Sequence, residues 1–152
     1  MVSEHRVVVD WRSGGEEFSY ESYSRNHVWR FAGGEEVPAS AAPEYKGDPA
    51  RVDPEAALVA AISSCHMLTF LVLAAKKRFA VASYVDDAVG VMEKNEEGRV
   101  AVTRVTLRPA IAFEGERLPS AADLDKLHHQ AHEHCFIANS VRTVVTVEAP
   151  GS

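Results

Sequence analysis

Two cysteines and a group of histidines are the residues of this chain best suited to chemistry. Cys65 lies in an apolar run and is followed by His66, and Cys135 ends the segment HHQAHEHC at residues 128–135. A thiolate can attack an oxidant, and a second thiol can convert the resulting sulfenic acid to a disulfide. The residue types leave three interpretations open: a redox pair, two core cysteines, or a metal site.

The two other interpretations rest on burial and on ligand spacing. Free cysteine is among the most buried residue types, so both cysteines can be core residues while the histidines lie on a solvated helix face. His128 and His132 are four residues apart and share a helix face, but the chain has no CxxC or HExxH motif and no evident fourth ligand. His66 could add positive charge beside Cys65, but it points about 100° away from the cysteine around a helix, and we expect it to pack elsewhere.

A redox role for Cys65 requires groups that stabilise its thiolate. A helix N-terminus does so, and Ser63 and Ser64 are placed to interrupt the helix directly before the cysteine. A nearby cationic side chain also stabilises a thiolate. The candidates are Arg25, in the segment YSRNH, and Arg51, in the loop before the apolar run.

The segment that carries Cys65, residues 53–78, is predicted to be a long helix. Its first residues, DPE at 53–55, supply an N-cap, a proline at the first helical position and an acid at the positive end of the helix dipole. Residues 56–75 carry no charge and are long enough to span a bilayer, but the start signals indicate a soluble helix that is buried on every side. One sheet covers only one face of such a helix, so we expect a homodimer to cover the other.

The remaining chain is predicted to be α+β and to form a single domain over residues 1–152. Thr103 and Arg104 shift the phase of alternating valines and predict a β-bulge. Ser120 with Asp123 predicts a capping box. We expect, in order, a β hairpin or meander at 5–31, a proline-rich loop at 35–54, the long helix, two long strands around a turn at 95–98, a helix from 120 to 135 and a strand at 140–148.

Composition limits the classes of partner and the compartment. A formal net charge of −6 argues against a nucleic-acid partner. Two cysteines in 152 residues are too few for a secreted disulfide scaffold, and the first residues lack the features of a signal peptide. We expect a cytoplasmic protein without membrane insertion, whose thiols are reduced at rest.

Two segments resemble the OsmC/Ohr family of thiol-dependent hydroperoxide reductases. The segment DPEAALVAAISSCHMLTFLVLAA is similar to the family's segment with a glutamate ten residues before the reactive cysteine, and HEHCFIANSV is similar to its second-cysteine segment. The separation of seventy residues between the two cysteines is also similar. The resemblance extends from about Tyr23 onward and implies an OsmC-like fold in an intertwined homodimer, with two long central helices packed among sheets from both subunits.

The resemblance also implies the role of each site residue. Cys65 is the peroxidatic cysteine, Cys135 the resolving cysteine and Glu55 the family glutamate, and the family's N-terminal arginine favours Arg25, with Arg51 as the alternative. The implied activity is the reduction of organic hydroperoxides to alcohols through a Cys65 sulfenic acid and a Cys65–Cys135 disulfide, in oxidative stress defence. An external dithiol, such as a lipoyl-type reductant, restores the thiols, and neither a metal nor another cofactor takes part.

Helix geometry constrains how Glu55 acts. On a straight helix Glu55 and Cys65 are separated by about 15 Å along the axis, so they do not touch. We expect that the helix breaks at Ser63 and Ser64, that Arg25 spans the gap, or both.

The substrate would be bound by apolar side chains near Cys65. Met67, Leu68 and Phe70 would form a pocket that suits alkyl or lipid hydroperoxides, unless they are plain core residues. The alternative function is that of a noncatalytic member of the same fold, in which the cysteines are structural and the pocket holds a small apolar ligand.

Overall fold

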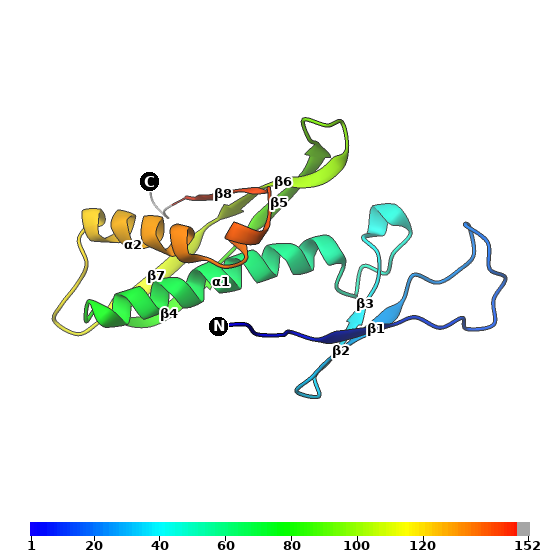
Figure 1. Cartoon of the computed structure of the whole chain (residues 1–152), viewed down its shortest axis with the longest axis horizontal. Helices are drawn as coiled ribbons and strands as arrows, with labels where there is room; N and C mark the ends of the chain where they lie inside the picture. Colours follow the sequence, from blue (N-terminus) through cyan, green and yellow to red (C-terminus); the bar gives the residue numbers. More distant parts are fainter. Residues whose placement is uncertain (149–152) are drawn as a thin grey trace. The chain divides into compact units, whose positions relative to one another are not determined.

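The computed structural model describes residues 1–148 of the chain, which divides into two compact units, Met1–Ala57 and Leu58–Ser152. The described residues form two α-helices and eight β-strands, which confirms the predicted α+β class (Figure 1). Each unit is described by itself. The prediction of a single domain stays a prediction.

The N-terminal unit contains a three-stranded antiparallel meander, as expected. Its strands are β1 (Val7–Asp10), β2 (His27–Phe31) and β3 (Glu36–Ala39), in the order β1-β2-β3. The prediction of an irregular loop over 35–54 is wrong at its start, where β3 forms. Pro38 is tolerated in β3 because this strand lies at the edge of the sheet. There the missing backbone N–H of proline does not remove a hydrogen bond between central strands.

The segment between β3 and the long helix is an ordered loop with a short 3₁₀ turn at Pro43–Tyr45. Ser40 is buried, and its Oγ accepts a hydrogen bond of 3.1 Å from the backbone N–H of Asp48. A Cβ atom at Gly47 would lie 1.5 Å from the carbonyl oxygen of Ala41, so only glycine fits there. These contacts hold the chain that leads to Arg51.

The long helix α1 spans Pro54–Lys76 without interruption. Its predicted N-cap is confirmed, because Asp53 Oδ1 accepts a hydrogen bond of 2.8 Å from the N–H of Ala56. The break expected at Ser63 and Ser64 is wrong. The hydroxyl of Ser63 donates to the Asp86 carboxylate instead of competing with the helix backbone, so the helix continues through both serines.

The C-terminal unit contains two sheets. Strands β4 (Ala80–Asp86) and β7 (Pro109–Glu114) pair antiparallel, and β5 (Val89–Lys94), β6 (Val100–Leu107) and β8 (Val144–Val147) form the order β5-β6-β8, with β6 and β8 parallel. The prediction of two long strands is therefore wrong, because each is divided in two. Between β6 and β7, the backbone N–H of Arg108 donates a hydrogen bond to Asp86 Oδ1 instead of to a backbone carbonyl oxygen of a neighbouring strand.

Two local predictions for this unit are confirmed. Val91 pairs with Arg104 and Met92 with Val102, which leaves Thr103 as the extra residue of a bulge. Helix α2 (Ala121–His134) begins with the predicted capping box, in which Ser120 Oγ accepts from the N–H of Asp123 and the Asp123 carboxylate accepts from the N–H of Ser120.

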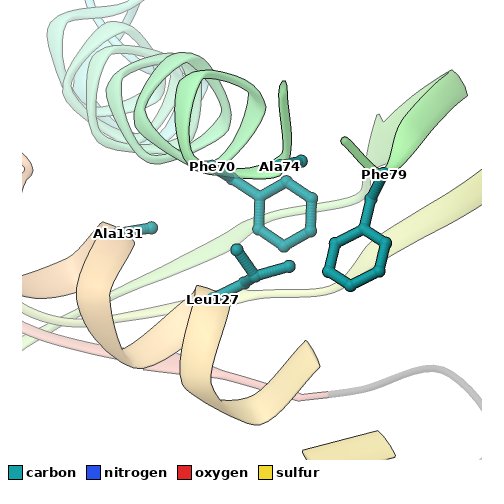
Figure 2. Packing of buried hydrophobic residues seen from close by; sticks show 5 residues of the cluster. All are labelled: Phe70, Ala74, Phe79, Leu127 and Ala131. Atoms are coloured by element: carbon teal, nitrogen blue, oxygen red, sulfur yellow. The ribbon is translucent and has the colours of Figure 1, made fainter. Parts of the chain in front are cut away.

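Helices α1 and α2 pack against each other in the core of the C-terminal unit. Phe70 and Ala74 of α1 face Leu127 and Ala131 of α2, and Phe79 completes the buried cluster (Figure 2). A second cluster, farther toward the start of α1, contains the buried residues Ile62, Val105 and Leu107. Both clusters use the same face of α1.

The opposite face of α1 is uncovered in the single chain. Leu68 is 57% exposed and Val72 is 53% exposed, whereas Ile62, His66, Phe70 and Ala74 are buried on the core face. The expectation of a helix buried on every side is thus wrong for one chain by itself. By length and composition alone, α1 is also apolar enough to cross a membrane, a property that core helices of soluble proteins share.

Candidate functional site

The two cysteines meet where α1 and α2 pack together. Cys65 is half-buried in the middle of α1, and Cys135 caps the C-terminal end of α2 with 1% of its surface exposed. Both are free thiols. Because the helices run antiparallel, with Phe70 beside His128 and Cys65 beside Cys135, the end of α2 lies near the middle of α1 (Figure 1). The structure therefore brings together two residues that are seventy positions apart.

The thiol of Cys135 has an environment that keeps it protonated. Burial raises its pKa, and the hydrogen bond and the charge of the neighbouring Cys65 sulfur raise it further. Backbone N–H groups of Ala138 and Ile137 act in the opposite direction, and the Ala138 nitrogen lies 3.4 Å from Cys135 Sγ. At neutral pH, Cys135 is thus a buried thiol, whereas Cys65 is the more accessible of the two.

A pair of histidines also joins the two helices. His66 Nε2 and His128 Nδ1 are 3.0 Å apart, and the two rings stack with centroids 5.3 Å apart. His66 is 1% exposed, and its Nδ1 makes no hydrogen bond with the described residues. Burial, together with the charges of His128 and His132, lowers the pKa of His66 to about 4, so the ring is neutral at neutral pH.

Sequence reasoning missed this histidine pair. We expected His66 to pack away from the site. The helical spacing of four residues could have shown that His66 belongs to the buried face: Ile62, His66, Phe70 and Ala74. No comparable signal links His66 to His128, because a partner on another helix is not encoded in the spacing of either one.

Arg25 lies in the N-terminal unit, in the loop before β2. Its guanidinium donates to the carbonyl oxygens of Tyr23 at 2.6 Å and Tyr20 at 2.7 Å, and lies 3.7 Å from the centroid of the Tyr23 ring. Among the described residues, no carboxylate forms an ion pair with Arg25. Its positive charge is therefore oriented by neutral groups and not neutralised within this unit.

Arg51 lies in the same unit but is paired differently. Its guanidinium donates to the His27 carbonyl oxygen at 3.2 Å and lies 3.8 Å from the carboxylate of Asp48. It lines a hollow of about 260 Å³ with six other residues: Asp10, Arg12, Asn26, His27, Val28 and Arg30. The charge of Arg51 is thus partly compensated by an acid.

Glu55 lies in the first turn of α1, within the N-terminal unit. Its Oε2 is buried and accepts no hydrogen bond from the described residues. A buried carboxylate without a donor is unfavourable, so this oxygen is suited to a cationic partner. How Glu55 and the two arginines lie relative to the cysteines stays a prediction, because they belong to the other unit.

The predicted pocket of Met67, Leu68 and Phe70 is wrong. Phe70 is fully buried in the core cluster, whereas Leu68 is 57% exposed. Residues two apart lie about 200° apart around a helix and face opposite sides. A hollow of about 380 Å³ in the C-terminal unit is instead lined by six residues near the end of α1: Leu71, Ala75, Arg78, Phe79, Ala80 and Val81.

The remaining histidines of α2 do not gather into a ligand set. His129 lies on the surface and pairs with Glu133 at 3.3 Å, and His132 and His134 are exposed. Within residues 1–148, no group of three or more His, Cys, Asp or Glu side chains is arranged to hold a metal ion.

Comparisons with known proteins agree with the fold and with the sequence resemblance. A family model described as OsmC-like protein matches residues 47–149. The structure of an OsmC-like protein of unknown function from Vibrio cholerae is 50% identical, with a TM-score of 0.94, and the match covers 97% of this chain and 99% of that one. No curated protein matched the sequence.

Two more distant structures share the fold. An organic hydroperoxide resistance protein OsmC from Legionella pneumophila is 16% identical, with a TM-score of 0.69 and 97% of both chains covered. An organic hydroperoxide resistance protein from Elizabethkingia anophelis is also 16% identical, with a TM-score of 0.68 and coverage of 98% of this chain and 96% of that one. The family match and the Vibrio structure together show that this chain belongs to the OsmC-like protein family.

Proposed function

We propose that this protein is a thiol-dependent peroxidase that reduces organic hydroperoxides to alcohols in oxidative stress defence. The observation that carries the proposal is the meeting of Cys65, half-buried, with Cys135, buried and protonated, at the packed helices. The hydroperoxide resistance proteins of Legionella and Elizabethkingia, which share the fold, support the substrate class.

In the first step, the Cys65 thiolate attacks the terminal oxygen of the hydroperoxide. A sulfur–oxygen bond forms, the oxygen–oxygen bond breaks, and the alkoxide takes up a proton and leaves as the alcohol. The sulfur is oxidised by two electrons to a sulfenic acid, and the peroxide is reduced by the same two electrons. The more accessible of the two thiols suits this step.

In the second step, Cys135 attacks the sulfenic sulfur of Cys65. A disulfide forms, and the hydroxide that leaves takes the proton of Cys135 to become water. Because the pKa of Cys135 is raised, its thiol still carries that proton at neutral pH. An external dithiol, such as a lipoyl-type compound, then reduces the disulfide by thiol–disulfide exchange and is itself oxidised.

The stabilising cation is proposed to be Arg25. Because α1 is continuous at Ser63 and Ser64, no helix N-terminus lies beside Cys65, and a side chain must supply the positive charge. Arg25 has no carboxylate partner among the described residues, and the buried Oε2 of Glu55 lacks a donor. A guanidinium bound by Glu55 would stabilise both the Cys65 thiolate and the developing alkoxide.

The assembly is proposed to be a cytoplasmic homodimer without membrane insertion. The uncovered face of α1 carries Leu68 and Val72, and covering it with a second copy removes this apolar surface from water. Such a dimer also allows the residues of one site to come from two chains.

The activity predicts a defined loss of thiols. One equivalent of cumene hydroperoxide added to the reduced protein should consume two thiols per chain, as counted with a thiol reagent. Cys135→Ser should lose only the Cys65 thiol, and Cys65→Ser should lose none, because the first attack is then absent. Unchanged thiols in the native protein would contradict the peroxidase and favour a noncatalytic ligand-binding role with structural cysteines.

The roles of the two thiols predict an order of alkylation. A short pulse of iodoacetamide at pH 7 should modify Cys65 at least about tenfold faster than Cys135, because a buried, protonated thiol is a poor nucleophile. Peptide mass spectrometry measures the modified fraction at each site. Faster modification of Cys135 would reverse the assigned roles.

The two arginines are distinguished by matched variants. Arg25→Gln should lower the second-order rate constant for oxidation of Cys65 by about 100-fold, because it removes the charge that stabilises the thiolate and the alkoxide. Arg51→Gln should stay within about threefold of the native rate. Stopped-flow oxidation gives both constants, and the opposite order would assign the role to Arg51.

The dimer predicts the effect of a charge on the uncovered face. Leu68→Asp should shift the protein toward monomers at micromolar concentration, because an unpaired carboxylate would be buried at the interface. Leu118, which is 62% exposed in the loop before α2, is the matched control, and Leu118→Asp should leave the mass unchanged. Analytical ultracentrifugation measures the mass, and a monomeric native protein would disprove the dimer.

A further inference from the structure

The His66–His128 contact has a distinctive place between the two cysteine-bearing helices. His66 directly follows Cys65 on α1, and His128 precedes Cys135 by seven residues, about two helical turns. It is a hydrogen bond between side chains that joins α1 to α2. The other contacts of the two helices at the core are apolar.

The pair is not suited to acid–base chemistry at the sulfur. His66 Nε2 is occupied by His128, and the His66 ring lies about 100° around the helix from Cys65. A neutral ring also supplies no charge to a thiolate. A role as a link between the helices is the one that its geometry supports.

The buried Nδ1 of His66 indicates how the protons are arranged. Orphaned buried backbone N–H groups are rarer in proteins than unpaired acceptors, and the same preference applied to the ring assigns the unprotonated state to Nδ1 of His66. His66 then donates its Nε2–H to the lone pair of His128 Nδ1, which makes a single directional bond between two neutral rings.

Burial keeps the two rings neutral and outweighs the nearby carboxylates, which act in the opposite direction. Burial lowers the pKa of His128, while the carboxylates of Asp125 on α2 and Asp86 at the end of β4 raise it. His132, one turn along α2 from His128, lowers the pKa of His66 together with burial and His128. At neutral pH the rings therefore attract each other through the hydrogen bond rather than repel as two cations.

Disulfide formation is sensitive to the relative position of the two helices. Its Cβ atoms must approach to about 3.5–4.5 Å, and sliding of one helix by a single residue displaces them by about 1.5 Å. Apolar packing of Phe70 and Ala74 with Leu127 and Ala131 holds the helices together but is non-directional. An N–H···N bond constrains the sliding as well, because its strength falls steeply with angle.

We propose that the His66–His128 hydrogen bond positions α2 on α1 so that Cys135 reaches Cys65, and thereby favours disulfide formation between them. His66 and His128 are positioning residues in this role, since neither contacts the substrate. The inference rests on the proposed function only in treating the Cys65–Cys135 disulfide as part of the reaction cycle.

The test measures the disulfide equilibrium without a peroxide. The reduced protein is equilibrated with mixtures of oxidised and reduced dithiothreitol, so that two electrons and two protons pass from the cysteines to the oxidised reagent. His128→Leu should lower the equilibrium constant for disulfide formation by about tenfold, the size expected when one buried hydrogen-bond partner is removed. His128→Asn, whose amide replaces Nδ1, should stay within about threefold.

Two controls separate positioning from a general loss of structure. His129→Leu changes the neighbouring residue on α2, which lies on the surface, and should leave the equilibrium constant unchanged. The rate of Cys65 alkylation should be the same in native protein and His128→Leu, because the thiol itself is unaltered. If His128→Leu does not fold, His128→Phe replaces it, since it keeps the stacked ring and lacks Nδ1.

The possible results decide the inference. A folded His128→Leu or His128→Phe with the native equilibrium constant would overturn it, and so would failure of both variants to fold, which would assign the pair to stability. A native protein that forms no Cys65–Cys135 disulfide would also overturn it. The test uses dithiothreitol in place of a hydroperoxide, so it also separates the two proposals. If the protein does not react with hydroperoxides but its disulfide equilibrium constant depends on His128, only the proposed function is disproved.

Discussion

The antiparallel packing of α1 against α2 is the interaction on which the candidate site depends. Phe70 and Leu127 lie at its centre, and their burial removes large apolar side chains from water. This packing places the end of α2 beside the middle of α1, so that Cys65 and Cys135 meet although seventy residues separate them. Without it, each thiol would be an isolated cysteine on its own helix.

The apolar character of α1 has a second consequence. A helix rich in apolar residues on all sides can bury only one face within the C-terminal unit, and Leu68 and Val72 stay exposed. The same excess of apolar surface explains why α1 is similar in composition to a membrane span. A second copy of the chain would cover this apolar face. The proposed active site would then lie at the interface between the two copies.

The electrostatics of the site follow from the continuity of α1. A helix that does not break at Ser63 and Ser64 offers no dipole to the Cys65 sulfur, so the proposed mechanism relies on a guanidinium. Arg25 is held by carbonyl oxygens and an aromatic ring, which orient its charge without neutralising it. Burial keeps Cys135 protonated, and the two thiols therefore suit different steps of one reaction.

Much of the local structure could be predicted from sequence, because caps and bulges depend on neighbouring residues. The N-cap at Asp53, the capping box at Ser120 and the bulge at Thr103 were all predictable in this way. The family resemblance added the pairing of the two cysteines. Only the tertiary structure decided that α1 stays unbroken and that His66 bonds to His128, because Asp86 and His128 reach α1 from segments distant in the chain. The spacing of residues reveals which face of a helix is buried, but not which side chain it meets there.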